Sequence, residues 1–353
     1  MATAKAIVIT EAGKSAAILD VPRPRIRDEW MIVRTKAVGL NPTDWKHIYL
    51  PPLASDNVGA RVGSDYAGVV DEVGAKVTEF AKGDRVAGFS HGCNRLNHEI
   101  GAFGEYILVK ASAAFKIPDD VSFEQAAMTG SQLYTCALGL YQSLQLPLPN
   151  EPAKEPFPVL IQGGSTGTGM LAIQLAKQSG LTVVTTASPA NFDYLKWLGA
   201  DAVFDYRSPT CGKDINEYTS NDLQYAWDCA GGEEICATAL SSTKPSKYGW
   251  IAWPNNLELL KANPLIQDPM VVCAYDIFNE KYVEAGMEFN PPKETLEFSV
   301  MFKEIYVQLL EKKVLKPMHI DLNRNGSGLE GVMNGLNLLR EGKVSCAKLV
   351  YSL

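Results

Sequence analysis

A glycine-dense turn near the middle of the sequence has the residue types and spacing needed to hold a phosphate. The turn contains Gly163, Gly164, Gly167 and Gly169. It follows a short aliphatic run, residues 159–161, that suits a strand buried on both faces. Glycine lets the main chain approach a pyrophosphate, and a helix N-terminus offers it unpaired N–H groups and the positive end of the helix dipole. The turn therefore has the chemistry of an anion-binding site.

The segments around this turn indicate which anion it would bind. A helix-like segment with one apolar face follows the turn, Gly180 ends it, and a second strand begins at once. Strand, glycine turn, helix and strand within ~30 residues predict a dinucleotide-binding unit. The glycines depart from the G-x-G-x-x-G fingerprint, so a tight turn that binds no ligand is the alternative. The predicted pyrophosphate contacts are Gly164, Ser165, Thr166, Gly167 and Thr168.

The end of the second strand distinguishes NADPH from NADH. Binding of NAD needs a carboxylate about 20 residues beyond the glycine turn to hold the ribose 2′-hydroxyl. The strand here ends in Thr-Thr-Ala-Ser at residues 185–188, and the next carboxylate is Asp193. Ser188 and Asn191 can donate hydrogen bonds to a 2′-phosphate, which a carboxylate would repel, so we predict NADPH. The predicted contacts are Ser188, Pro189, Ala190, Asn191 and Tyr206. For Tyr206, core packing at a strand end is the alternative.

The bulk properties of the chain limit its class and its partners. At 353 residues it can bury a large core and split into two domains. A net charge of −7 argues against general affinity for nucleic acids or anionic membranes. The sequence has no apolar run of the ~18–20 residues that a membrane span needs, and its first residues lack the pattern of a secretory signal. Seven cysteines, none in a C-x-x-C motif, indicate reduced thiols and a cytoplasmic protein.

Two kinds of secondary structure divide the chain. Short strands separated by glycines predict an all-β region over roughly the first 110 residues. An apolar helix over 123–141 and a proline-rich connector, residues 146–158, come next. Alternating strands and helices then predict an α/β unit with a doubly wound parallel sheet. Its strands are expected at 159–162, 181–186, 202–206, 224–229, 248–253 and 270–275. An amphipathic helix is expected over 294–313, and the tail, 328–353, predicts a helix and a strand that return to the first region.

Short motifs along nearly the whole chain resemble the medium-chain dehydrogenase/reductase superfamily. They occur, in the order found in that superfamily, at 39–44, 63–68, 83–86, 101–106, 123–127, 173–177 and 198–201. The resemblance implies a GroES-like β domain of residues 1–130 and 290–353. It also implies an inserted Rossmann domain of residues 131–289 that binds NADPH.

Metal chemistry is not expected, although one branch of this superfamily binds zinc. In that branch Cys and His ligands stand where this chain has Asn41 and Ser64, and Asp65 stands in the place of a glutamate. A serine hydroxyl cannot replace an imidazole on zinc, and the chain has no cysteine cluster for a structural ion. We expect His91 and His98 to be solvated loop residues. The prediction is that there is no metal.

A closer resemblance is to the fungal trans-acting enoyl reductases. It rests on residues 146–149, 163–166, 187–193 and 203–207. It implies NADPH-dependent reduction of an α,β-unsaturated polyketide acyl chain on the acyl carrier domain of a partner polyketide synthase. Members of this clade act as monomers, and Pro254 would interrupt the edge pairing through which zinc-type relatives dimerise. The alternatives are a stand-alone quinone or alkenal reductase, or a Rossmann scaffold that has lost reduction.

Reduction of an enoyl thioester requires a hydride at the β-carbon, donors to the enolate oxygen and a proton for the α-carbon. The resemblance places Lys46 near the nicotinamide ribose, where it would donate to the enolate or anchor the cofactor; a surface lysine is the alternative. Thr135 and Tyr134 are further catalytic candidates, and a helix hydroxyl bonded to its own backbone is the alternative for Thr135. We expect Asp44 to fix the turn after Pro42.

The resemblance supplies the remaining site residues. The further cofactor contacts are Thr43, Asp44, Trp45, Lys46, Ala252, Trp253, Cys346, Ala347 and Lys348, the last facing a phosphate. The predicted acyl pocket consists of Met128, Thr129, Ser131, Leu133, Thr135, Val272, Tyr275 and Phe278.

Overall fold

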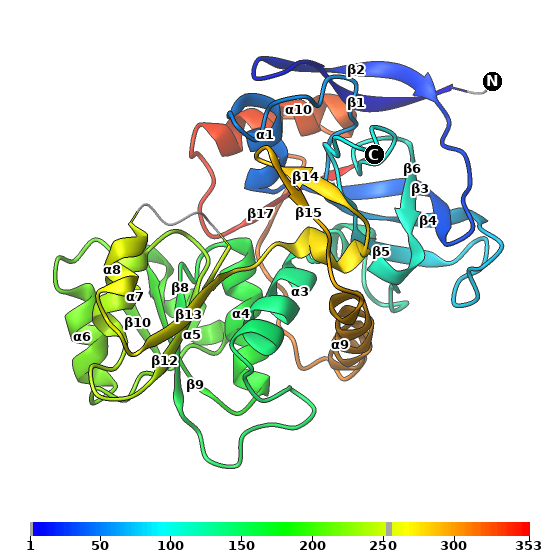
Figure 1. The fold of residues 1–353 in the computed structure, drawn as a ribbon. Helices are drawn as coiled ribbons and strands as arrows, with labels where there is room; N and C mark the ends of the chain where they lie inside the picture. Colours follow the sequence, from blue (N-terminus) through cyan, green and yellow to red (C-terminus); the bar gives the residue numbers. More distant parts are fainter. Residues whose placement is uncertain (1–2, 252–255) are drawn as a thin grey trace. The chain divides into compact units, whose positions relative to one another are not determined.

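The computed structural model describes residues 3–251 and 256–353, which cluster into two compact units (Figure 1). The first unit is residues 1–131, 275–311 and 319–353, and the second is 132–274 and 312–318. This division differs from the predicted one at residue 131, which belongs to the first unit, and in two longer segments. Residues 275–289 join the first unit, because their aromatic side chains pack on His91 and Phe89. Residues 312–318 join the second, where the Lys316 N–H donates to Gln174 Oε1 at 2.6 Å.

A six-stranded parallel sheet forms the second unit and confirms the predicted doubly wound α/β arrangement. The strand order is β10-β9-β8-β11-β12-β13, in which the first strand in sequence lies third and the order reverses beside it. The strands are β8 Pro158–Gln162, β9 Thr182–Ala187, β10 Ala202–Asp205, β11 Tyr225–Asp228, β12 Ser246–Trp250 and β13 Ile266–Val271. The last strand lies earlier than predicted, because residues 274–278 form a 3₁₀ helix, η4.

Helices cover the sheet of the second unit and close its core. They are α4 Gly167–Gln178, α5 Phe192–Leu198, α6 Cys211–Tyr218, α7 Glu233–Ala239 and α8 Leu257–Lys261. Buried side chains from strands and helices, among them Leu160, Val184, Ile215 and Tyr248, form one apolar cluster. Burial of this cluster removes apolar surface from water and stabilises the unit.

The single apolar helix predicted over 123–141 is wrong. The structure has a one-turn helix, α2 Phe123–Ala126, then α3 Gly130–Cys136, which continues as a π-helical segment, Ala137–Ser143. Close backbone approaches explain the break, because a Cβ on Gly130 would lie 2.1 Å from the Gly88 carbonyl oxygen. In the π-helical segment, a Cβ on Gly139 would lie 2.4 Å from the Trp227 ring, so the irregular turn accommodates a tryptophan.

The first unit is built on a seven-stranded sheet with an antiparallel hairpin beside it. The sheet order is β16-β17-β3-β4-β5-β7, and β6 also pairs with β3. The strands are β3 Trp30–Gly39, β4 Asp65–Val73, β5 Arg85–Phe89, β6 Tyr106–Lys110, β7 Ala114–Lys116, β16 Ile320–Leu322 and β17 Lys348–Ser352, and the hairpin is β1 Thr3–Glu11 with β2 Ser15–Pro22. The pairing of β17 with β3 confirms that the tail returns to this region.

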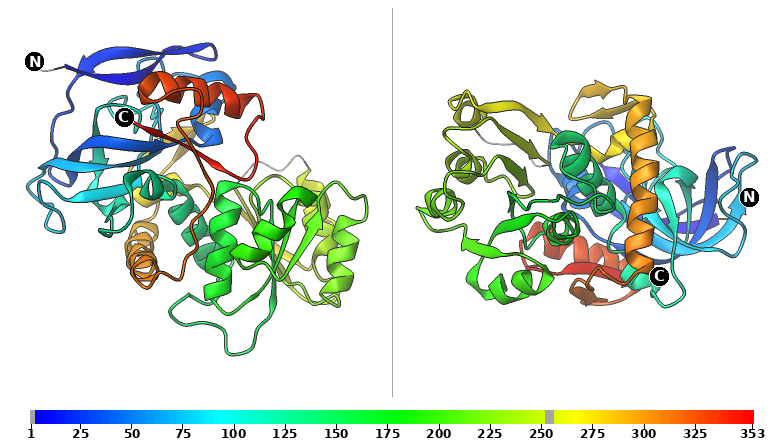
Figure 2. Two further views of the ribbon diagram at one scale, coloured as in Figure 1. Left: turned by 180° about the vertical axis from the view of Figure 1, so that it is seen from behind. Right: turned by 90° about the horizontal axis from the view of Figure 1, so that it is seen from below.

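Helices and a second hairpin complete the first unit. They are α1 Pro42–Tyr49, α9 Lys293–Glu311, α10 Gly328–Arg340 and the hairpin β14 Tyr282–Glu284 with β15 Met287–Phe289. Figure 2 shows α9 as the long orange helix in its right-hand view. Helix α10 packs so closely on β17 that a Cβ on Gly335 would lie 2.5 Å from the Tyr351 hydroxyl oxygen. Within the part of the chain that the structure describes, no helix combines the length and the apolar character needed to span a membrane.

Candidate functional site

The glycine turn of the second unit folds into a compact cradle at the carboxyl end of β8. Gly163 adopts a φ of +77°, a conformation that side chains disfavour. A Cβ on Gly164 would lie 2.1 Å from Thr185 Oγ1, and one on Gly169 would lie 2.3 Å from the Gly163 carbonyl oxygen. Both positions are therefore restricted to glycine by the close approach of neighbouring atoms.

Helix α4 begins in this turn and presents its N-terminus there. Thr166 is the N-cap: its Oγ1 accepts a hydrogen bond from the Gly169 N–H at 3.0 Å and donates one to the Gly163 carbonyl oxygen at 2.8 Å. The first amides of a helix have no intrahelical partner, and Gly167 and Thr168 supply those amides here. The cap fixes their direction, so the residues fit a bound phosphate.

Groups at the ends of two adjacent strands extend the cradle. Gln162, at the end of β8, is 5% exposed, and its Oε1 has no hydrogen-bond partner among the described residues. A Cβ on Gly232 would lie 2.1 Å from Gln162 Nε2. At the end of β11, Asp228 accepts hydrogen bonds from the amides of residues 230–232 at 2.7–2.9 Å and from the Tyr248 hydroxyl at 2.7 Å. Strand order reverses between β8 and β11, where doubly wound sheets bind their ligands, so the arrangement fits a dinucleotide.

A cavity of about 450 Å³ lies farther along this edge of the second unit. Its lining includes Tyr206, Arg207, Lys213 and Gly232. Tyr206 is 48% exposed, so the alternative of core packing is wrong. The Arg207 guanidinium donates to both carboxylate oxygens of Asp205, at 3.0 and 3.1 Å, so it is paired with a residue two positions before it.

Residues 188–191 follow β9 in a 3₁₀ turn. Pro189 and Ala190 are exposed, and Ser188 and Asn191 are half-buried. Neither the Ser188 nor the Asn191 side chain caps the helical turn that follows it. The strand end therefore presents two short polar side chains and no carboxylate. The predicted contacts Ala252 and Trp253, and Pro254 beside them, lie outside the described residues.

In the first unit, a buried polar network surrounds the start of α1. Asp44 accepts hydrogen bonds from the Asn41 N–H at 2.7 Å and from the Ser64 hydroxyl at 2.6 Å. Burial raises the pKa of Asp44 to about 7. Both carboxylate oxygens of Asp44 are thus used to fix the turn.

Lys348 and Asp65 form a buried ion pair in the same network. The Lys348 Nζ donates to Asp65 Oδ2 at 2.9 Å and to Asn41 Oδ1, and the two charged side chains are 4% and 0% exposed. Asp65 also accepts from the Ser131 N–H and hydroxyl at 2.6 and 3.1 Å. The expectation that Lys348 faces a phosphate is therefore corrected, because its ammonium group is held by these oxygens. Ser131, expected in the acyl pocket, instead holds Asp65.

Lys46 is half-buried on α1, and burial lowers its pKa. Among the described residues, no hydrogen-bond or ion-pair partner is found for its ammonium group. Trp45 beside it is half-buried and packs against the core of the first unit. A half-buried cation that the fold does not pair is suited to contact a ligand, so Lys46 keeps its candidate role.

An aromatic wall forms around Tyr275, one of the predicted pocket residues. The His91 ring stacks on the Tyr275 ring with centroids 3.8 Å apart, and Phe89 stacks on it at 5.6 Å. Phe278 contacts both His91 and Phe89. The expectation that His91 is a solvated loop residue is wrong: it is buried, and burial lowers its pKa to about 3. His98 is exposed, as expected.

Several predicted pocket residues are part of the protein core. The Tyr306 hydroxyl donates to Thr129 Oγ1 at 2.9 Å, so the Thr129 hydroxyl is bonded to helix α9. Met128 is buried, and Leu133 and Tyr134 are 0% exposed, so a ligand would not reach the Tyr134 hydroxyl. Thr135 is half-buried, and Val272 continues the sheet by donating its N–H to the Trp250 carbonyl oxygen at 2.9 Å.

Two of the predicted cofactor contacts precede strand β17. Cys346 is buried with a φ of +51°, and Ala347 is half-buried.

Sequence reasoning missed the pair formed by His47, which follows Lys46 in the sequence, and Glu284. His47 Nε2 lies 2.8 Å from Glu284 Oε1, and His47 Nδ1 lies 2.8 Å from the Thr43 carbonyl oxygen. His47 is 3% exposed. The two partners are 237 positions apart in the chain, so no local pattern could have joined them.

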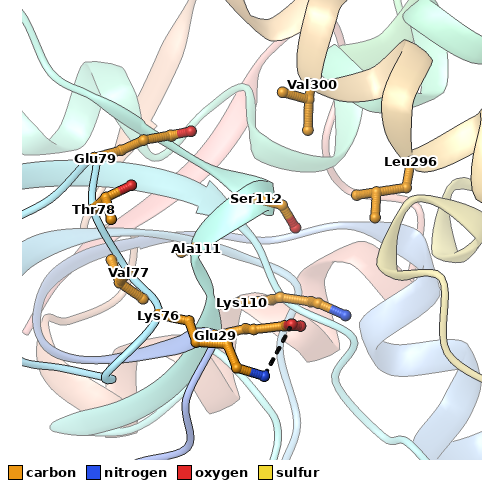
Figure 3. A pocket seen from close by; sticks show the side chains of 10 residues that line it. All are labelled: Glu29, Lys76, Val77, Thr78, Glu79, Lys110, Ala111, Ser112, Leu296 and Val300. Atoms are coloured by element: carbon orange, nitrogen blue, oxygen red, sulfur yellow. Dashed lines mark ion pairs between the residues drawn. The ribbon is translucent and has the colours of Figure 1, made fainter.

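A separate cavity of about 260 Å³ in the first unit includes none of the predicted site residues (Figure 3). Both charge signs line it: Lys76 lies 4.0 Å from Glu29, and Lys110 donates to the Phe278 carbonyl oxygen at 2.7 Å and to Glu280 at 3.0 Å. Its charges are paired, and it is not part of the candidate site. Across residues 3–251 and 256–353, no group of three or more His, Cys, Asp or Glu side chains could hold a metal ion.

Two family models match the chain. The alcohol dehydrogenase GroES-like domain matches residues 27–119, and the zinc-binding dehydrogenase model matches residues 167–252. Among solved structures, the quinone oxidoreductase from Coxiella burnetii is similar with a TM-score of 0.77 at 24% identity, covering 100% of both chains. CurK enoyl reductase is similar with a TM-score of 0.76 at 17% identity, covering 99% of both chains. These structures share the two-domain medium-chain dehydrogenase/reductase fold.

Curated relatives match over most or all of the chain. Trans-enoyl reductase ACTTS2 of Alternaria alternata is 37% identical over 356 residues, which cover 100% of both chains. Trans-enoyl reductase caaB of Aspergillus niger is 38% identical over 366 residues, which cover 99% of this chain and 96% of caaB. Trans-enoyl reductase TOXD of Cochliobolus carbonum is 41% identical, covering 83% of this chain and 96% of TOXD. The chain therefore belongs to the trans-enoyl reductases, oxidoreductases of the medium-chain dehydrogenase/reductase superfamily, which implies a nicotinamide cofactor.

Proposed function

We propose that this enzyme uses NADPH to reduce an α,β-unsaturated polyketide acyl chain carried on the acyl carrier domain of a partner polyketide synthase. The observation that carries the proposal is the glycine cradle at α4, followed by a strand, β9, that ends without a carboxylate. A nicotinamide dinucleotide fits the cradle, and the names of the relatives, which cover 83–100% of the chain, give the reaction class.

The choice of NADPH over NADH rests on residues 188–191. Ser188 and Asn191 would donate hydrogen bonds to the 2′-phosphate, and the exposed Tyr206 would lie against the adenosine. The amides of Gly167 and Thr168 would hold the pyrophosphate. NADPH, when bound, supplies the hydride for the β-carbon. A carboxylate in the place of Ser188 would instead accept from a 2′-hydroxyl and favour NADH.

Lys46 is the proposed donor to the oxygen on which negative charge develops. Its ammonium group lacks a partner among the described residues and is partly desolvated, which strengthens its interaction with an anion. Anchoring of the cofactor is the other role that this group can perform, and kinetics separate the two. Thr135, half-buried on α3, is the second proposed contact with the acyl chain.

A monomer that acts on a separate synthase is the proposed assembly. Strand β13 is last in the sheet order of the second unit, and it contains Pro269. Proline has no N–H to donate and is unsuited to pairing an edge strand with a second copy. Light scattering after gel filtration tests this: a mass near 38.5 kDa supports a monomer, and twice that mass rejects it.

The experiment that tests the function is turnover of purified protein with NADPH and enoyl-pantetheine thioesters. Oxidation of NADPH with formation of the saturated thioester supports the proposal. Turnover of simple quinones without use of the thioesters would identify a stand-alone quinone reductase instead. A scaffold that has lost reduction would show no turnover, and NADPH would not raise its melting temperature, whereas a ligand at 100 times its Kd adds about 2.7 kcal/mol of stability.

A further inference from the structure

Four side chains of the first unit form a continuous row of hydrogen-bonding groups. Glu284 Oε1 lies 2.8 Å from His47 Nε2, and His47 Nδ1 lies 3.1 Å from Thr43 Oγ1. Thr43 Oγ1 in turn lies 3.3 Å from the Tyr275 hydroxyl oxygen. The row thus connects the β14 hairpin, through α1, to the aromatic wall.

The histidine in this row has acceptors on both sides. Nε2 faces the Glu284 carboxylate, and Nδ1 also lies 2.8 Å from the Thr43 carbonyl oxygen, which can only accept. A neutral imidazole carries a single N–H, so it cannot donate to both. The His47–Glu284 pair therefore holds one additional proton, as an imidazolium beside a carboxylate or as an imidazole beside a carboxylic acid.

The groups around His47 favour retention of that proton. Burial lowers the pKa of His47, but the hydrogen bond and charge of Glu284, the Thr43 carbonyl oxygen and the charge of Asp44 together raise it above its ordinary value. His91, which stacks on Tyr275, has a lowered pKa and is neutral. Cys93, also buried, has a thiol pKa raised by burial and stays protonated. Tyr282 donates its hydroxyl proton to Asp276 at 2.8 Å and is outside the row.

We propose that Glu284, His47, Thr43 and Tyr275 form a proton relay that protonates the α-carbon of the reduced acyl chain. The proposal rests on the proposed enoyl-reductase function. Tyr275 is the catalytic residue of the relay, and the other three are positioning residues that act through it. Stacking against His91 and Phe89 holds the Tyr275 ring in place.

The proposed step conserves protons and charge. After the β-carbon has received its hydride, a C–H bond forms at the α-carbon of the enolate as the O–H bond of Tyr275 breaks. The Tyr275 oxygen takes the proton of the Thr43 hydroxyl, which takes the Nδ1 proton of His47. The negative charge of the enolate and the positive charge of the imidazolium disappear together. Water then returns a proton to the His47–Glu284 pair, whose Glu284 side chain is 15% exposed.

The test uses NADPH and trans-2-butenoyl-pantetheine in D₂O, with Tyr275→Phe as the variant and Tyr282→Phe as the matched control. A general acid contributes typically 10²–10⁴-fold, so Tyr275→Phe is expected to lower kcat about 100-fold. Wild type should place deuterium on one face of the α-carbon, as read by NMR of a chiral ester of the product. Tyr275→Phe should place it on both faces, because solvent replaces the relay, and Tyr282→Phe should match wild type.

A pH profile tests the positioning residues, because a merely structural contact would not move it. His47 is charged below its pKa, so kcat of wild type should fall as pH rises through that pKa. Glu284→Gln removes the charge that raises this pKa, so the fall should occur at lower pH, and Glu284→Asp should restore part of the shift. Melting temperatures of all variants show whether they are folded.

Two results separate the relay from the function on which it rests. If wild type does not oxidise NADPH with the thioester, the proposed function fails before any variant is compared. If wild type reduces the thioester and Tyr275→Phe, folded, keeps both kcat and single-face deuteration, the relay is overturned while the function stands.

Discussion

The Lys348 ammonium group lies 2.9 Å from the Asp65 carboxylate, and neither side chain is more than 4% exposed. Asn41 completes the group by donating its Nδ2 to Asp65 Oδ2 at 2.9 Å. By the superfamily resemblance, Asn41 occupies the position of a cysteine ligand of the zinc-binding branch, and Asp65 the position of the glutamate that follows its histidine ligand. A lysine side chain therefore supplies the positive charge that these oxygens require.

Removal of the Lys348 charge is expected to destabilise the first unit. Lys348→Met leaves Asp65 buried without its ammonium partner, which costs about 3–5 kcal/mol of unfolding free energy. Urea denaturation measures the change. Lys343→Met is the control, because Lys343 and its partner Glu341 are 59% and 46% exposed. Equal midpoints for Lys348→Met and wild type would show that the buried pair does not stabilise the fold.

Asp44 is expected to make stability depend on pH. Its pKa is raised from 3.8 to about 7 by burial, so the folded state favours the protonated form. This contribution is complete below pH ~4 and is lost as pH rises towards 7, and at ~1.36 kcal/mol per pKa unit it amounts to about 4 kcal/mol. Asp44→Asn does not titrate, so the difference in unfolding free energy between wild type and variant should change over this range. A difference that is constant from pH 4 to pH 8 would contradict the assignment.

Ser188→Asp is expected to reverse the cofactor preference. The new carboxylate would repel a 2′-phosphate and accept from a 2′-hydroxyl, and we expect NADPH to bind about tenfold more weakly, which corresponds to ~1.4 kcal/mol. Fluorescence titration with NADPH and NADH measures both Kd values. Ser188→Ala removes the hydroxyl without adding charge and should weaken NADPH without improving NADH. Unchanged affinities in Ser188→Asp would place the 2′-phosphate elsewhere.

Lys46→Met distinguishes the two roles of the Lys46 ammonium group. If it donates to the developing enolate, kcat should fall about 100-fold with little change in the Kd of NADPH. If it anchors the cofactor, the Kd should rise and kcat should be nearly kept. Lys82→Met is the control, since Lys82 is exposed and pairs at 3.4 Å with Asp71 in the same unit. A variant that behaves like Lys82→Met in both measurements would remove Lys46 from the site.

The parts of the fold that follow local patterns were predictable from the sequence. The aliphatic run before Gly163 and the capped helix after it identify a βαβ unit, because the hydrophobic period and the turn residues lie within one short window. The last sheet strand was predicted at 270–275 instead of 266–271 because residues 271–273, Val-Val-Cys, are apolar and resemble a strand. Sequence alone did not show that the proline-containing segment β13 is the strand that pairs with β12.

The parts of the site that depend on distant contacts were not predictable. His91 lies in a loop after β5, and it is buried by rings that are far away in the sequence, those of Tyr275, Phe278 and Tyr282. The pairing of Glu284 with His47, and of Lys348 with Asp65, joins residues from opposite halves of the chain. Lys46 could be predicted as a candidate because it follows a motif, which is a local signal.

The second unit includes residues 312–318, which are separated in the sequence from its main segment, residues 132–274. The chain passes between the two units four times, after residues 131, 274, 311 and 318. Gln174, which is 3% exposed, accepts from the Lys316 N–H at 2.6 Å and donates to the Lys316 carbonyl oxygen at 3.2 Å. A fragment ending at residue 274 would leave both polar groups of this amide without those partners. A chimera that exchanges the cofactor-binding unit between relatives should therefore include residues 312–318 as well as residues 132–274.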